Sequence, residues 1–131
     1  AVLGKGGFKH LALANPKLAP YGAAAMQTLE ALGLTDRVGS KIVQGENIAQ
    51  TYQFVATGNA ETGFVANSQI RGWQGHPGTV WPVPSEYYQP INQAAVLLLR
   101  GKNNPSAAAF MDYLKSDDAR DVIEGLGYDV K

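Results

Sequence analysis

The stretch KHLALANPKLAPYGAAAMQTLEALG, residues 9–33, decides the fold. Its first six residues are a short apolar run that Asn15-Pro16 halts, which predicts a buried strand ending in a turn. Pro20 opens the next segment, where apolar residues recur at helical spacing: Ala25, Met26, Leu29 and Leu32. Gly33 is a natural end for that helix. The stretch therefore predicts a strand followed by a helix.

The same order recurs downstream. KIVQG, residues 41–45, predicts a second short strand. Asn47 and Gln50 have the spacing of a capping box, so a helix is expected from Ile48 to about Gly58. TGFVA, residues 62–66, predicts a third strand. Strands alternating with helices over short connections favour an α/β fold with a mixed, mostly parallel sheet flanked by helices.

The other predicted elements are a turn between the first helix and the second strand, and several segments after Ser68, where the chain changes character. LTDRVGS (34–40) predicts a short helical turn or loop, and TVWPVP (79–84) a short strand ending at prolines. AAVLLLR (94–100) is the most apolar run in the chain and predicts a buried strand. A helix is expected from Pro105 to Leu114, and Ser116 or Asp117 can cap a final helix that ends before Gly127.

Composition excludes several classes of protein. The 131 residues are 45% apolar and 17% charged, as in one folded domain. Eleven basic and eleven acidic residues give a net charge of zero, which argues against a nucleic-acid-binding protein. Cysteine is absent, so disulfides and thiolate metal sites are excluded. No stretch is apolar over enough residues to span a bilayer or resembles a signal peptide, and the chain starts without Met, as a fragment of a longer protein does.

No catalytic or metal-binding arrangement is found among the polar residues. His10 and His76 have no partner at a recognised spacing, and a strand edge and a turn explain them. Asp117, Asp118 and Asp121 lie where the start of a helix favours negative charge, without the pattern of a calcium loop. Core packing or a turn clamp is the expected role of four aromatic residues: Trp73, Trp81, Tyr87 and Tyr88. An enzyme is therefore not expected.

Two helix starts are the remaining candidates for a site. Those at Tyr21-Gly22 and Asn47-Ile48 each follow a strand, so both belong at the carboxyl edge of the sheet, where ligands bind in folds of this kind. Unpaired amides and the positive end of the helix dipole suit an anion there. Since every helix has a start, the residues by themselves still favour an ordinary turn.

Three longer stretches carry a family resemblance: LALANPKLAPYGAAAMQTLEALGL (11–34), KIVQGENIAQTYQFVATGNAETGFVANSQI (41–70) and PINQAAVLLLRGKNNPSAAAFMDYLKSDDARDVIEGLGY (90–128). Together they resemble the periplasmic molybdate-binding proteins, the ModA family of ABC importers. The resemblance implies a type II periplasmic-binding-protein fold, in which two α/β lobes close on a tetrahedral oxyanion held by neutral donors. It implies molybdate or tungstate as ligand, an ABC-transporter permease in the membrane as partner, and neither a cofactor nor a metal ion beyond the molybdate contacts.

The resemblance also implies site residues. The helix starts matching APYG and ENIA supply backbone amides to the anion, which here are those of Tyr21 and Ile48. Many family members have a tyrosine at the end of the strand that reads GFVA here, and this sequence has Ala66 instead. We expect the hydroxyl of Tyr21 to take over that role.

The resemblance covers only part of a full-length family member. Residues 1–92 match the second, ligand-binding lobe, whereas residues 93–131 match the return crossing strand and the C-terminal helices, which pack on the first lobe in such proteins. We therefore expect a fragment of a mature periplasmic protein from a Gram-negative bacterium, without its signal peptide. The fragment should bind molybdate weakly or not at all, and should self-associate, for example as a segment-exchanged dimer. Two alternatives stay open: a binding protein for sulfate or phosphate, and a ligand-free interaction domain.

Overall fold

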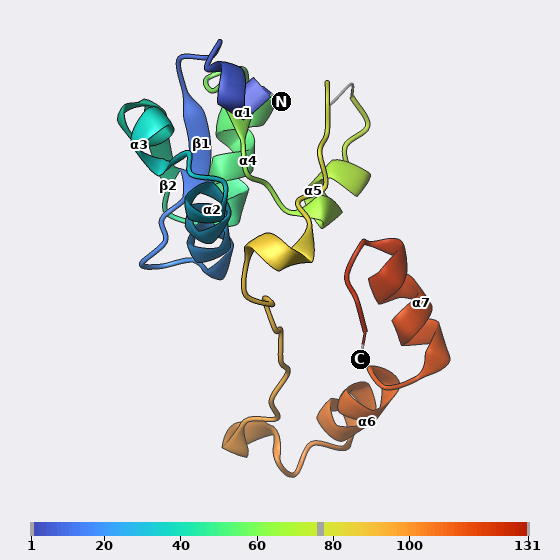
Figure 1. Cartoon of the computed structure of the whole chain (residues 1–131). Helices are drawn as coiled ribbons and strands as arrows, with labels where there is room; N and C mark the ends of the chain where they lie inside the picture. Colours follow the sequence, from blue (N-terminus) through green and yellow to red (C-terminus); the bar gives the residue numbers. More distant parts are fainter. Residues whose placement is uncertain (1, 76–77, 131) are drawn as a thin grey trace. The chain divides into compact units, whose positions relative to one another are not determined.

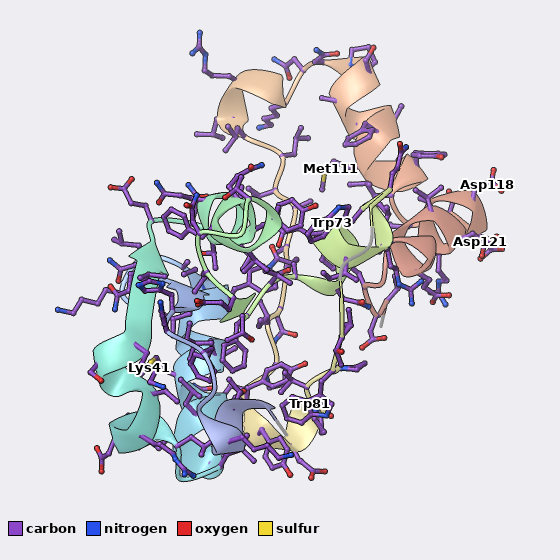
Figure 2. All side chains as sticks on the ribbon, turned by 90° about the horizontal axis from the view of Figure 1, so that it is seen from above. Lys41, Trp73, Trp81, Met111, Asp118 and Asp121 are labelled. Atoms are coloured by element: carbon purple, nitrogen blue, oxygen red, sulfur yellow. The ribbon has the colours of Figure 1, made fainter. Side chains whose placement is uncertain are left out.

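The computed structural model describes residues 2–75 and 78–130 (Figure 1), and Figure 2 shows their side chains on the ribbon. The chain divides into two compact units, Ala1–Ile91 and Asn92–Lys131. Of the helices described, none combines the length and the apolar character that crossing a bilayer requires.

A parallel sheet forms the centre of the first unit. Strand β1 (Leu11–Ala14) lies between β2 (Ile42–Gly45) and β3 (Thr62–Gly63), in the order β2-β1-β3. Leu11 is opposite Ile42 on one side and Thr62 on the other, and Ala14 is opposite Gly45. The three strands predicted before residue 67 are present and every pairing in the described residues is parallel, which confirms the predicted α/β fold. β3 is shorter than predicted, although the amide of Phe64 still donates to the carbonyl of Ala12 at 2.9 Å.

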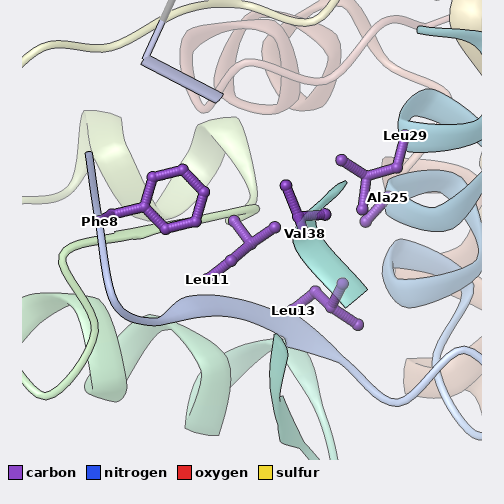
Figure 3. Packing of buried hydrophobic residues seen from close by; sticks show 6 residues of the cluster. All are labelled: Phe8, Leu11, Leu13, Ala25, Leu29 and Val38. Atoms are coloured by element: carbon purple, nitrogen blue, oxygen red, sulfur yellow. The ribbon is translucent and has the colours of Figure 1, made fainter. Parts of the chain in front are cut away.

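One face of the sheet carries the main apolar core. Helix α2 (Pro20–Ala31) packs Ala25 and Leu29 on Leu11 and Leu13 of the central strand (Figure 3). Val38, from α3 (Thr35–Val38), and Phe8 complete this cluster. Burying several such side chains contributes about 1.5–3 kcal/mol each to the free energy of unfolding. The alternation of a strand places Leu11 and Leu13 toward α2 and leaves Ala12 for the opposite face.

Helix α4 (Ile48–Ala56) covers that opposite face. A methyl group built on Gly63 would lie 2.6 Å from Cγ2 of Val55 and 3.1 Å from Cβ of Ala12, so α4 lies close against the sheet here. Thr51 of α4 is fully buried. With α2 on one face and α4 on the other, the sheet is covered on both sides, as parallel sheets are.

The segment before β1 is fixed by one lysine. After the short helix α1 (Val2–Lys5) the chain turns at Gly6, and Nζ of Lys41 donates to the carbonyls of Gly6 at 2.7 Å and Phe8 at 2.9 Å. The same Nζ lies 4.8 Å from the centroid of the Phe8 ring. Lys41 belongs to the 3₁₀ turn η1 (Gly39–Lys41) that leads into β2, so it joins the start of the chain to the second strand.

The last part of the first unit differs from the prediction. After α5 (Asn67–Arg71), the described residues of the predicted strand 79–84 form no strand, and a 3₁₀ turn η2 (Ser85–Tyr87) follows. Pro82 and Pro84 explain the difference, because neither has an amide to donate to a ladder. The amide of Gln89 donates to Oε1 of Gln27 at 2.8 Å, which fixes this segment to α2.

The second unit is helical. Its helices α6 (Pro105–Tyr113) and α7 (Asp117–Gly125) confirm the two predicted helices. In the structure Asn104 caps the first of them and Ser116, one of the two predicted caps, the second. The predicted buried strand 94–100 is wrong: the segment forms no strand and ends in the 3₁₀ turn η3 (Leu99–Gly101). Val96 is 75% exposed and Leu99 is 88% exposed. A strand needs a neighbouring strand to complete its hydrogen bonds, and the described residues of this unit contain none.

Candidate anion-binding edge

Three helices begin at the carboxyl edge of the sheet. β1 leads into α2, β2 into α4 and β3 into α5, so all three helix starts follow the ends of parallel strands. The amide of Asn15 donates to the carbonyl of Gly45 at 2.7 Å, which joins the chain leaving β1 to the end of β2. The two predicted helix starts, at Tyr21 and at Ile48, are therefore both at this edge.

The start of α2 is built from backbone groups. Ala19 is the N-cap residue and its side chain cannot accept a hydrogen bond, while Pro20 stands at the first helical position. Asn15 shapes the loop that leads into α2. Its Oδ1 accepts a hydrogen bond from the amide of Lys17 at 3.0 Å, and its carbonyl accepts one from the amide of Ala19 at 2.9 Å. Tyr21 is the second residue of the helix and is half-buried.

Two glycines bring helices α2 and α4 against the strand ends. A methyl group on Gly22 would lie 2.0 Å from the carbonyl oxygen of Ala14, at the end of β1. One on Gly45, at the end of β2, would lie 2.6 Å from Oγ1 and 2.8 Å from the amide nitrogen of Thr51 in α4. Both glycines are needed for a close approach of backbone segments. The sequence signal for this geometry is a glycine within a few residues of each strand-to-helix connection.

The start of α4 carries the predicted cap. Oδ1 of Asn47 accepts from the amide of Gln50 at 2.9 Å, which confirms the spacing read from the sequence. In return, Oε1 of Gln50 accepts from the amide of Glu46 at 2.7 Å, one residue earlier than in a regular capping box. Among the described residues, the amides of Ile48 and Ala49 have no acceptor. They are the donors that this helix start can offer to a ligand.

The start of α5 is joined to that of α4 by a residue that the sequence analysis missed. Oε1 of Gln69 accepts from the amide of Ala66 at 2.9 Å, and its Nε2 donates to the carbonyl of Ile48 at 3.1 Å. Ala66 is 4% exposed and has no side-chain donor. A signal was present, since Gln69 follows the N-cap Ala66 by three residues, the same spacing as Asn47 and Gln50.

His10 and Glu61 form a pair outside this edge. The amide of His10 donates to Oε2 of Glu61 at 2.9 Å, and its Nδ1 lies 3.8 Å from the same oxygen. The backbone hydrogen bond from His10 is the main cause that lowers the pKa of Glu61, followed by that from its own amide. Both residues precede strands and so lie at the amino edge of the sheet, away from the helix starts. His76 lies outside the described residues.

The acidic residues of α7 have a structural explanation. Asp117 and Asp118 are in its first turn, whose amide at Ala119 donates to Oγ of Ser116 at 3.2 Å. Figure 2 labels Asp118 and Asp121 on this helix. Negative charge at a helix start is favourable by about 0.3–1 kcal/mol. Across residues 2–75 and 78–130, no three His, Cys, Asp or Glu side chains are grouped as a metal site requires.

The aromatic residues have different surroundings. The ring of Trp73 meets that of Tyr52 edge to face, with centroids 5.3 Å apart at 75°, as the packing prediction requires. Trp81, by contrast, is 48% exposed and contributes little to a core (Figure 2). Tyr87 and Tyr88 are half-buried.

Two open hollows lie on the surface of the first unit. One, of about 240 Å³, is lined by residues of α2 and the η2 segment: Gln27, Glu86, Tyr87, Tyr88 and Gln89. The other, of about 440 Å³, is lined by the end of α2 and the start of α3: Met26, Glu30, Gly33, Thr35 and Asp36. Neither is lined by Tyr21 or Ile48. The candidate edge is therefore not part of either hollow.

Known proteins resemble the chain over nearly its whole length. Residues 1–129 match the family described as bacterial extracellular solute-binding protein. The molybdate-binding protein ModA of Azotobacter vinelandii is 57% identical over 129 residues, which are 98% of this chain and 51% of that protein. ModA of Rhodobacter capsulatus is 47% identical over 120 residues, 92% of this chain and 47% of that protein.

Solved structures agree with the sequence comparison. A periplasmic molybdate-binding protein of Azotobacter vinelandii superposes with a TM-score of 0.90 and 37% identity, covering 99% of this chain and 58% of that structure. This match confirms the predicted fold, that of a periplasmic-binding-protein lobe. The chain spans about half the length of the curated relatives it matches. From its fold and its match over residues 1–129, the chain belongs to the family of bacterial extracellular solute-binding proteins.

Proposed function

We propose that the chain is part of a periplasmic binding protein that captures a tetrahedral oxyanion, molybdate or tungstate, and delivers it to an ABC importer. The relatives named for molybdate binding support this proposal. The observation that carries it is the pair of helix starts, at Tyr21 and Ile48, on one edge of a parallel sheet. Backbone amides at helix starts bind anions without a charged side chain, and the role proposed is binding without catalysis.

Tyr21 and Ile48 are the proposed oxyanion-binding residues. The amide of Ile48 has no acceptor among the described residues, so an anion could accept from it without breaking another bond. At the third helix start, the amide of Ala66 is already bound to Gln69, and its methyl side chain cannot donate. For that reason we assign a second contribution to Tyr21, from its phenol hydroxyl, in place of a donor at position 66. No cofactor is needed for this chemistry.

Two substitutions separate the amide from the side chain at position 48. Ile48 stands at the first helical position, where proline fits, and Asn47 before it has the extended conformation that precedes proline (φ −145°, ψ 173°). Ile48→Pro therefore removes the donor while keeping the helix, whereas Ile48→Ala shortens the side chain and keeps the donor. A hydrogen bond to a charged group contributes about 1.5–3 kcal/mol, so Ile48→Pro should weaken oxyanion binding about ten- to a hundredfold.

Binding is best measured in a protein of the relatives' full length. One suitable protein joins this chain to the part of Azotobacter vinelandii ModA that it does not match, since the matched part is 57% identical. Calorimetric titration with molybdate, tungstate, sulfate and phosphate should show tight binding of the first two. Preference for sulfate or phosphate would support the alternative oxyanion, and no binding of any oxyanion would support a ligand-free interaction domain. Tyr21→Phe in the same protein tests the hydroxyl.

The 131-residue chain alone should bind molybdate weakly or not at all. We assign residues 1–92 to the ligand-binding lobe and residues 93–131 to a return segment and helices that pack on a first lobe. An anion that meets the donors of one lobe only stays partly hydrated and gains little affinity. Titration of molybdate into the chain alone and into the full-length fusion compares the two directly.

The apolar surface of the second unit supports the assignment to a larger assembly. Phe110 is 59% exposed, Val122 is 59% exposed and Leu98 is 67% exposed. Large apolar side chains that gather on an exposed surface are usually covered by another protein surface. In the absence of a first lobe we expect self-association, with exchange of the C-terminal segment between copies as one route. Size-exclusion chromatography with light scattering measures it, and a stable monomer at high concentration would contradict it.

A further inference from the structure

Side-chain amides determine which backbone donors stay open at the carboxyl edge. Gln50 accepts from the amide of Glu46, Asn47 accepts from that of Gln50, and Gln69 accepts from that of Ala66. Gln69 differs from the other two because its second polar atom reaches another element, at the carbonyl of Ile48 in α4. That bond spans 21 residues of sequence and joins two of the three helix starts.

The bond to Ile48 also fixes the direction of a neighbouring donor. The carbonyl of Ile48 and the amide N–H of Ala49 belong to one planar peptide group and point in opposite directions. A donor that holds the carbonyl from one side therefore orients the N–H of Ala49 on the other side. Hydrogen bonding at the carbonyl also polarises the peptide and strengthens its N–H as a donor.

The preceding peptide group is held in the same way. The carbonyl of Asn47, which shares its plane with the amide of Ile48, accepts from the amide of Thr51 at 3.1 Å and from Oγ1 of Thr51 at 2.9 Å. Thr51 is fully buried. Both open amides of α4 thus belong to peptide groups whose carbonyls are hydrogen-bonded, one through Thr51 and the other through Gln69.

A second contact joins the same two elements. Tyr52 lies one helical turn after Ile48, and its ring packs on that of Trp73, two residues after the end of α5. The segment from Gln69 to Trp73 is therefore attached to α4 at two successive turns. This arrangement limits the movement of the first turn of α4 relative to the end of β3.

From these contacts we propose that Gln69 is a positioning residue for the oxyanion site, which holds the Ile48–Ala49 peptide so that its N–H donates to the bound anion. The inference rests on the proposed function. It adds Ala49 as a second donor of α4 and makes α5 part of the site, although Gln69 itself contacts no anion. A role confined to capping α5 is the competing explanation.

Three substitutions distinguish these explanations. Gln69→Glu can still accept from the amide of Ala66 but has lost the N–H that binds the carbonyl of Ile48, whereas Gln69→Leu loses both bonds. Gln53→Leu is the matched control, because Gln53 is an exposed glutamine of α4 whose side chain makes no hydrogen bond within the described residues. If Gln69 only caps α5, Gln69→Glu leaves the Ala49 peptide in place, and any loss of molybdate affinity then comes from the added negative charge and is absent in Gln69→Leu.

The experiment has one arm without ligand and one with it. Without ligand, the ¹⁵N resonance of Ala49 in the chain should move in Gln69→Glu and Gln69→Leu, and stay in place in Gln53→Leu. In the full-length fusion, both Gln69 variants should bind molybdate about five- to tenfold more weakly, the effect of one hydrogen bond. Gln69→Glu should weaken molybdate and tungstate alike, since one geometry serves both.

The two proposals can fail separately. An Ala49 resonance unchanged in Gln69→Glu, or a molybdate affinity equal to that of the parent, would overturn the positioning role of Gln69. Failure of the parent fusion to bind any oxyanion would overturn the proposed function and the ligand role of Gln69 with it. In that case the resonance arm still decides whether Gln69 holds the peptide.

Discussion

Substitution of Gly22 by alanine tests whether the start of α2 is fixed against the end of β1. The added methyl carbon would lie 2.0 Å from the carbonyl oxygen of Ala14, 2.6 Å from its carbonyl carbon and 2.9 Å from that of Asn15. All three are backbone atoms of a central strand and its turn, so no side-chain rotation relieves the contact. The helix start must move by about 1 Å or more to restore an ordinary separation.

The expected change in the free energy of unfolding of Gly22→Ala is the sum of two opposing effects. Overpacking a well-packed site destabilises by about 1–3 kcal/mol, and the backbone contacts place Gly22→Ala at the upper end, about 3 kcal/mol. Alanine in place of glycine favours a helix by about 1 kcal/mol, which leaves a net loss of about 2 kcal/mol. For a chain of 131 residues, that loss corresponds to a fall of about 7 °C in melting temperature.

Thermal unfolding followed by circular dichroism measures the effect. Gly39→Ala is the control, because a methyl group there meets no atom within 4 Å and the residue has a helical backbone (φ −52°, ψ −43°). We expect it to be neutral or slightly stabilising. The packing argument is refuted if Gly22→Ala has the melting temperature of the parent protein. It is also refuted if Gly39→Ala lowers the melting temperature as much as Gly22→Ala does. Oxyanion binding in the full-length fusion should also weaken in Gly22→Ala only.

Three further substitutions test local contacts. Asn47→Ala removes the cap of α4 and should lower the free energy of unfolding by about 1 kcal/mol in urea titrations, whereas Asn47→Asp should retain most of it. Lys41→Met removes two hydrogen bonds from a charged group and should lower the free energy of unfolding by about 1–2 kcal/mol, whereas Lys9→Met should change it little. Equal losses in the two variants would contradict the role of Lys41. The pKa of Glu61 is lowered in the folded protein by the amide of His10, so its contribution to stability is present above the pKa of the unfolded chain and is lost as pH falls through the folded pKa. Glu61→Gln should therefore flatten the loss of stability on acidification, and an NMR titration that finds an ordinary pKa for Glu61 would contradict the assignment.

The sequence predicts the first half of the fold well because local and tertiary preferences agree there. The apolar run ending at Ala14 is the fully buried central strand, and the cap at Asn47 marks the start of α4 to the residue. The two wrong strands have different causes. At residues 79–84, two prolines outweigh the apolar pattern, whereas at residues 94–100 the pattern favours a strand but no neighbouring strand is described in that unit.

The candidate edge could be predicted only in outline. Helix starts at Tyr21 and Ile48 follow from periodicity and capping signals, because these signals are local in sequence. The bond between Gln69 and Ile48 joins residues 21 positions apart, and no local pattern specifies it. The same holds for Gly22, since its contact with Ala14 depends on the direction in which α2 leaves the sheet.

The short length of β3 has a consequence for how the sheet opens. β1 and β2 share four residue pairs, whereas β3 is joined to β1 at only two, across about fifty residues of chain. Contacts that are few and distant in sequence form late during folding and separate first in local unfolding. Amide hydrogen exchange should therefore be slowest in β1 and β2 and faster in β3 and α5. Brief openings of the sheet would release the segment that contains Gln69 while the connections from β1 to α2 and from β2 to α4 stay folded.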